Sequence, residues 1–310
     1  MKKQKFKDIN FRENFKDLEN EKYFRMVSFL AGQNIDFKTE YINNEASNII
    51  KHHAFRDFHG MLKKSEVKRF LPIKGIWLFN NTFREFQGIR QMADVDLLFH
   101  KDEFEKLPEI IDEYPEFELK SKGSLKLRSR FAEEISVIYK NILIEMHSNI
   151  TLVSFPGLMD EIFKNSETEN IDGVEVLNPP VEFALIIMLL HDYSRADFAD
   201  LTVARLLEFF IVLRTADIEK LKKIASRFGL ERMLQSHLFM IFTMLENTES
   251  LREHFTVCPE HGMIEKGNGS KAFSISDPRK FQKFIYGKQA GKLFLRNCVA
   301  GIFKKAGMNR

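Results

Sequence analysis

Two aspartates separated by one residue, Asp94 and Asp96, lie at the start of an apolar run that ends at Phe99. In a β-strand successive side chains point to opposite faces, so the two carboxylates would share one face, and Val95 and Leu97 the other. Adjacent carboxylates repel each other by about 4 kcal/mol at 4 Å and an effective dielectric constant near 20. Mg²⁺ is suited to such a pair, because it takes carboxylate oxygens and leaves positions for water and substrate phosphates.

A strand, a glycine turn and the start of a helix precede this pair. Phe70–Ile73 is predicted to be the strand, Lys74-Gly75 the turn, and Ile76–Phe83 the helix. Glycine lets a phosphate approach the backbone, and a helix N-terminus offers free N–H groups. The order therefore predicts a phosphate-binding turn with Lys74 as a point charge beside it; a solvated lysine at a strand end is the alternative.

A second strand, Ile142–His147, carries another acidic residue. Glu145 and His147 share one face of it, and a sheet could bring them beside Asp94 and Asp96. Glu145 alone could equally be a salt-bridged strand residue. His147 could contact a substrate, orient Glu145 or cap the sheet.

These motifs together resemble the uncharacterised bacterial nucleotidyltransferase family, within the DNA polymerase beta-like superfamily. The resemblance covers roughly residues 40–215 and rests on Lys74-Gly75, Arg90, Asp94-Val-Asp96-Leu-Leu, Ile142–His147 and the helical stretch Pro180–His191. The superfamily usually has Gly-Gly or Gly-Ser close before the aspartates. Here a single glycine follows Lys74 and lies 19 residues before Asp94.

The resemblance implies an α+β fold: a nucleotidyltransferase-like mixed β-sheet with flanking helices, N-terminal helices and a helical C-terminal half. It implies an enzyme that moves a nucleoside monophosphate from an NTP to a hydroxyl acceptor and releases pyrophosphate. Asp94, Asp96 and Glu145 would be catalytic and would hold the metal, two Mg²⁺ ions or Mn²⁺. Glu145 would share a metal and draw the proton from the attacking hydroxyl.

Other residues are candidates for substrate binding besides Lys74, Gly75 and His147. Arg90 could pair with the aspartates or the triphosphate, or be a surface charge. His191 lies on the apolar stripe of its helix, so it is either a buried, hydrogen-bonded histidine or faces the nucleotide. Arg205 and Glu208 are three residues apart in the next predicted helix and are expected to pair; Glu208 also matches an acidic residue of related sequences.

The composition is that of a globular protein, with 44% hydrophobic and 29% charged residues among 310. The net charge of +3 is too small to argue for nucleic acid by itself. Two cysteines suit a reducing compartment. The basic N-terminus lacks the apolar run of a signal peptide, and the longest apolar run, Phe183–Leu190, is too short for a transmembrane segment. We expect a cytoplasmic location.

Three regions are predicted: an N-terminal helical segment (1–69), an α/β core (70–177), and a helical C-terminal domain with a basic tail (178–310). Helices are also expected at Tyr23–Gln33, Tyr41–Arg69, Asp102–Tyr114 and Pro156–Phe163, and strands at Phe117–Leu119, Leu125–Phe131, Glu134–Tyr139 and Gly173–Leu177. A metal site at His52 and His59 is disfavoured because unpaired surface histidines are far commoner. One at Cys258 and His261 is disfavoured because it offers too few ligands.

The acceptor is open: a small molecule, a peptide, a protein or an RNA end. Residues 279–310 hold nine Lys or Arg and no Asp or Glu. This amphipathic stretch either packs on the body or contacts RNA, a membrane surface or an acidic partner. Two alternatives to the enzyme follow: a non-catalytic nucleotide-binding module, and a toxin-like nucleotidyltransferase that modifies tRNA through the basic tail.

Overall fold

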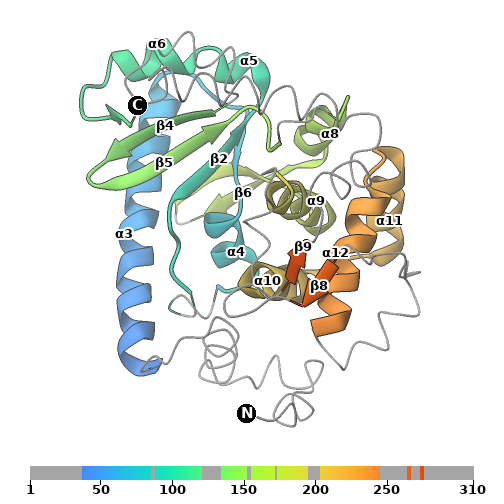
Figure 1. Ribbon diagram of the computed structural model, residues 1–310. Helices are drawn as coiled ribbons and strands as arrows, with labels where there is room; N and C mark the ends of the chain where they lie inside the picture. The colour runs from blue at the N-terminus through green and yellow to red at the C-terminus, as the bar shows by residue number, and fades with distance from the viewer. Residues whose placement is uncertain are drawn as a thin grey trace, which may run out of the picture.

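A mixed five-stranded sheet with helices packed around it organises the computed structural model (Figure 1). The structure describes residues 37–84, 88, 90–120, 134–151, 155–171, 173–194, 203–244, 264–266 and 273–275. The strand order is β1-β2-β5-β4-β3, which makes β2 and β5 interior strands. The fold is α+β, which confirms the predicted class.

Most of the sheet comes from strands that the sequence predicts. Its members are β1 (Phe70–Pro72), β2 (Val95–Phe99), β3 (Glu118–Leu119), β4 (Glu134–Tyr139) and β5 (Ile142–His147). β2 pairs antiparallel with β1 and parallel with β5, and β4 pairs antiparallel with β5 and β3. Lys140 and Asn141 form a two-residue turn between β4 and β5. Their φ angles, 48° and 64°, are both positive, which is the conformation of a common type of hairpin turn.

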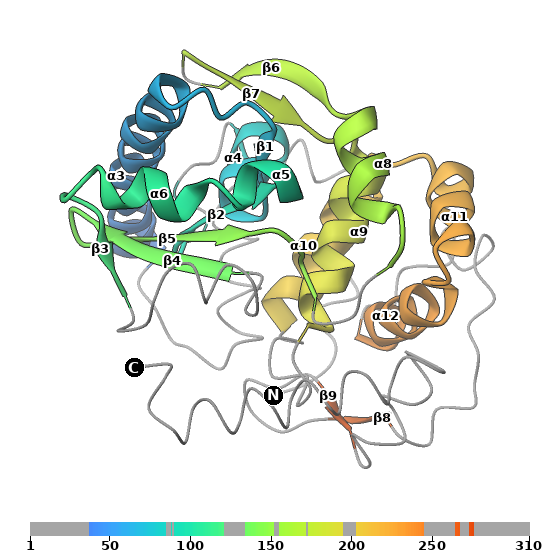
Figure 2. The ribbon, with the colours of Figure 1, turned by 90° about the horizontal axis from the view of Figure 1, so that it is seen from above.

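Helix α3 (Phe37–Lys64) runs beside the sheet, and a group of helices lies on the far side of the molecule from it (Figures 1 and 2). That group is α9 (Val181–Asp192), α10 (Val203–Leu213), α11 (Ile218–Arg227) and α12 (Glu231–Met244). α9 contacts the other three and is buried on nearly every side. One apolar core runs from α3 through the sheet to α12. It fixes the helices relative to the strands.

Short elements complete the architecture. They are α4 (Gly75–Asn81), α5 (Lys101–Phe104), α6 (Leu107–Asp112), α8 (Leu158–Asn165), the hairpin β6 (Glu167–Ile171) and β7 (Val174–Asn178), and the hairpin β8 (Ile264–Lys266) and β9 (Phe273–Ile275). No helix in the described ranges has both the length and the apolar character to cross a bilayer.

One local prediction is wrong, and one strand is missing from the predictions. The single helix expected over Asp102–Tyr114 is two short helices, because Pro108, at the start of α6, has no N–H to donate into the preceding turn. Strand β6 is not predicted because its sequence, Glu-Thr-Glu-Asn-Ile, is mostly polar. Four of its five side chains are exposed in the structure. Backbone pairing with β7 holds it in place.

Other predicted features lie outside the described residues. These are the helix Tyr23–Gln33, the strand Leu125–Phe131, the pair Cys258 and His261, and the basic tail 279–310.

Candidate active site

The sheet brings the predicted carboxylates together. Asp96 lies in the middle of the sheet, and its register partner on the parallel neighbour β5 is Glu145. Asp94 stands just before β2, and all three residues line one pocket. The expected meeting of two separate strands around these acids is confirmed as geometry, and it depends on a parallel pairing that brings together residues about fifty positions apart.

Asp96 is only 2% exposed and binds two side chains through one oxygen. Lys74 Nζ donates to Asp96 Oδ1 at 2.7 Å, and His147 Nε2 lies 3.2 Å from the same oxygen. Burial by itself would raise the pKa of Asp96, but the Lys74 ammonium and the His147 hydrogen bond outweigh it and hold that pKa below its ordinary value. The carboxylate is therefore ionised and accepts from both partners.

Lys74 reaches Asp96 from an unusual backbone conformation. Its φ is 51° and its ψ −109°, at the residue that precedes α4. A non-glycine residue there stores about 1–3 kcal/mol of strain, and such strain gathers at functional sites. The conformation turns the chain from β1 into α4 and leaves the ammonium on the carboxylate.

Close packing explains why position 75 is a glycine. A Cβ at this position would lie 2.9 Å from Met92 Cγ. Glycine is therefore needed so that the segment before Asp94 can approach α4. α4 begins at Gly75 itself, one residue earlier than predicted, and Gly75 lines the pocket with Lys74.

The ionised forms of the other two carboxylates, Asp94 and Glu145, are less stabilised than that of Asp96. Burial and then the charge of Asp96 raise the pKa of Asp94. Burial, followed by the charges of Glu134, Asp96 and Asp94, raises the pKa of Glu145 to about 7. The site therefore has more negative charge than Lys74 alone neutralises.

In the part of the chain that the structure describes, one group could hold a metal ion through three residues: Asp96, Glu145 and His147. One ligand atom from each lies within 4.8 Å of the other two. Carboxylate oxygens suit Mg²⁺, and a carboxylate–imidazole set also suits Mn²⁺. The donor set thus fits a divalent cation, and His147 joins the predicted carboxylates as a candidate ligand.

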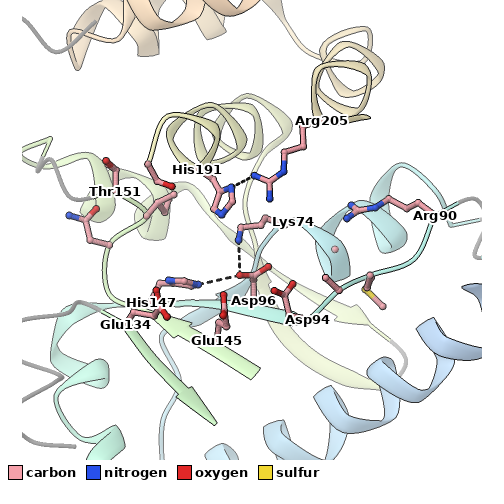
Figure 3. A pocket seen from close by; sticks show the side chains of 16 residues that line it. Lys74, Arg90, Asp94, Asp96, Glu134, Glu145, His147, Thr151, His191 and Arg205 are labelled. Carbon is pink, nitrogen blue, oxygen red and sulfur yellow. Dashed lines mark hydrogen bonds and ion pairs between the residues drawn. The ribbon is translucent and has the colours of Figure 1, made fainter. Parts of the chain in front are cut away.

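The pocket above these acids has a volume of about 510 Å³ (Figure 3). Its acidic lining residues are Asp94, Asp96, Glu134 and Glu145. The lining also includes the basic side chains Lys74, Arg90 and Arg205, with His191 between α9 and the sheet. Acids for cations and donors for anions therefore meet in one cavity.

Arg90 is held by other elements rather than by the aspartates. Its Nε lies 3.0 Å from Glu208 Oε1 on α10. Asn48 of α3 is fully buried; its Nδ2 donates to Arg90 O and its Oδ1 accepts from Met92 N, both at 2.8 Å. These contacts fix the segment that leads into β2.

The expected pairing of Arg205 with Glu208 is therefore replaced by two longer-range pairs. Glu208 pairs with Arg90, and Arg205 Nη1 lies 3.0 Å from Asp192 Oδ1. The spacing of three residues permits Arg205 and Glu208 to pair within the helix, but each pairs instead with a residue outside α10. His191 is largely buried, hydrogen-bonded to Arg205 and directed into the pocket; its contact with a nucleotide stays a prediction.

Several residues at or beside the pocket are not in the predicted set; Arg205, Glu134 and Asn48 are three of them. Arg205 and Glu134 line the pocket but stand in unremarkable sequence. Asn48 belongs to a stripe of polar residues on α3, which also contains Asn44 and Ser47. The recurrence of small polar residues at helical spacing is the sequence pattern that points to it.

A comparison with protein families gives the class of protein: a nucleotidyltransferase. The chain belongs to the uncharacterised nucleotidyltransferase family, whose model matches residues 32–246. A solved structure from Thermotoga maritima, described as a "putative nucleotidyltransferase", is similar over 44% of this chain and 81% of that chain, with 10% identity and a TM-score of 0.29. No curated protein matches the chain.

Proposed function

We propose that the protein is a Mg²⁺-dependent enzyme that transfers a nucleoside monophosphate from an NTP to a hydroxyl acceptor and releases pyrophosphate. The observation that carries the proposal is the register of β2 and β5, which sets Glu145 beside Asp96 at the edge of a cavity with basic side chains. A triphosphate with its metal needs both kinds of side chain within one pocket.

Asp94, Asp96 and Glu145 would hold the metal, two Mg²⁺ ions or Mn²⁺, and His147 is a further candidate ligand. The bound metal would lower the pKa of the acceptor hydroxyl and balance charge on the triphosphate. The Lys74 ammonium, 2.7 Å from Asp96 Oδ1, supplies positive charge to the same carboxylate. We infer that Lys74 turns to the phosphates when the cation binds.

The reaction forms one bond and breaks one. The acceptor oxygen bonds to the α-phosphorus, the bond from that phosphorus to the α–β bridging oxygen breaks, and pyrophosphate leaves with the bonding electrons. Glu145 would take the hydroxyl proton. Lys74, Arg90 and Arg205 would bind phosphate oxygens. A cytoplasmic location, with its supply of NTPs, is part of the proposal; the acceptor class stays open.

The test uses the full chain with each of the four α-labelled NTPs, Mg²⁺ or Mn²⁺, and a panel of hydroxyl acceptors including tRNA. We expect label transfer and pyrophosphate release, lost in Asp94→Asn and Asp96→Asn. Asp57→Asn is the matched control, because Asp57 pairs with Lys140 at the turn end of β5, away from Glu145. NTP binding without pyrophosphate release would identify a non-catalytic nucleotide-binding module. The absence of both NTP binding and pyrophosphate release would refute the proposal.

A further inference from the structure

His191 and Arg205 meet at the pocket from neighbouring helices (Figure 3). His191 lies in the last turn of α9, and Arg205 is on α10. Arg205 Nη1 donates to His191 Nδ1 and lies 3.0 Å from Asp192 Oδ1. One guanidinium nitrogen is thus anchored to a buried carboxylate and directed at one nitrogen of the imidazole.

This contact determines where the imidazole carries its proton. A guanidinium has only donors and stays charged in proteins, so His191 Nδ1 must offer its lone pair. A neutral imidazole with a lone pair on Nδ1 carries its proton on Nε2. The two ring nitrogens point in different directions, so the Nε2–H is directed away from Arg205 and is available to the pocket.

The surroundings also keep the ring neutral. Burial, then the positive charges of Lys74 and Arg205, lower the pKa of His191 to about 2. Asp96 acts in the opposite direction, and His147 adds to the lowering. His191 is therefore a hydrogen-bond donor that does not add a further full charge to the basic side chains Lys74, Arg90 and Arg205 of the pocket.

We propose that Arg205 is a positioning residue that fixes His191 as a neutral Nε2–H donor, and that His191 uses this proton to bind a phosphate oxygen of the NTP. The binding half of this inference rests on the proposed function. A phosphate oxygen is the expected acceptor, because Lys74 and Arg205 flank the imidazole and favour an anion there. A neutral donor adds a hydrogen bond without the desolvation cost of another buried cation.

The first experiment needs no ligand or activity. Long-range ¹H–¹⁵N spectra of the full chain, with the His191 signals assigned by their loss in His191→Gln, report which ring nitrogen carries the proton. We expect protonated Nε2 and unprotonated Nδ1 throughout pH 6 to 8. His59 is an internal reference, because its Nε2 lies 3.1 Å from the carbonyl oxygen of Glu175 and must donate to it.

Variants of Arg205 separate positioning from mere packing. Arg205→Met should let the neutral His191 exchange tautomers between pH 6 and 8, while His59 keeps its signals; Arg205→Lys, which retains a donor-only cation, should restore the locked state at least in part. A wild-type His191 that titrates near its ordinary pKa, or that carries its proton on Nδ1, would overturn the inference.

The second experiment measures binding of a non-hydrolysable NTP with Mn²⁺. We expect His191→Leu to weaken binding about tenfold, the effect of one hydrogen bond to a charged group, and His191→Gln, which keeps an N–H donor, to weaken it less. Wild-type affinity in His191→Leu would refute the binding half of the inference while the proposed function stood. No NTP binding by the wild type would refute both the proposed function and that half, and the spectra would still decide the role of Arg205.

Discussion

Metal affinity should depend on pH through Glu145, and the structure gives the size of the effect. Burial and the neighbouring carboxylates Glu134, Asp96 and Asp94 raise the pKa of Glu145 to about 7. A metal ligand must be deprotonated, so a proton on Glu145 competes with the cation. With a pKa of about 7, competition weakens binding by about elevenfold at pH 6, about twofold at pH 7 and hardly at all at pH 8. Affinity should therefore rise about tenfold from pH 6 to pH 8 and then level off.

Removing the charge of Glu134 tests the cause. Glu134→Gln keeps the oxygen that accepts from Ser136 Oγ at 3.0 Å but removes the second-largest contribution to the raised pKa. The variant should bind the metal with a weaker pH dependence, whose midpoint lies below that of the wild type. Calorimetric titration with Mn²⁺ at pH 6, 7 and 8 measures both proteins. An affinity that is the same at pH 6 and pH 8, or a midpoint that Glu134→Gln leaves unmoved, would refute the reasoning.

Three further variants address the supports of the site. Lys74→Met leaves the buried Asp96 without its cation and should lower the free energy of unfolding by about 3–5 kcal/mol in metal-free buffer; urea titration should show Mg²⁺ recovering part of it, and equal stability of the two proteins would contradict the pairing. Asn48→Leu removes both hydrogen bonds to the Arg90–Met92 segment and should raise the KM for NTP about tenfold, so an unchanged KM counts against the positioning of Arg90. Gly75→Ala should destabilise the fold by about 1–3 kcal/mol through overpacking, and Met92→Ala should relieve it in a double-mutant cycle; strictly additive effects would exclude the clash.

Local sequence patterns predict the strands that carry the site residues. The acid at Asp96 sits within an apolar run, and the alternation in Ile142–His147 places Glu145 and His147 on one face. Sequence patterns of this kind give strands and faces but not strand order. That β5 pairs with β2 in parallel follows from tertiary packing. Side-chain alternation allows the two strands to meet in one sheet, and the family resemblance favours that meeting.

The errors have physical causes that local patterns do not contain. β6 is a strand because β7 pairs with it, although its side chains are mostly polar and exposed. Arg205 and Glu208 find partners on other elements, at 3.0 Å in each case. Gly75 was interpreted only as an opening for phosphate, whereas close packing against Met92 explains why glycine stands there. The deciding neighbours of Arg205, Glu208 and Gly75 are 13 or more positions away in the sequence, whereas β7 directly follows β6 in a hairpin.

The most direct measurement is a crystal structure with a non-hydrolysable NTP and Mn²⁺, with anomalous diffraction used to locate the metal. The account predicts Mn²⁺ bound by Asp96 and Glu145, with the triphosphate reaching from the metal to Lys74. Manganese bound elsewhere at saturating NTP, or the Lys74–Asp96 pair intact beneath a bound nucleotide, would contradict it.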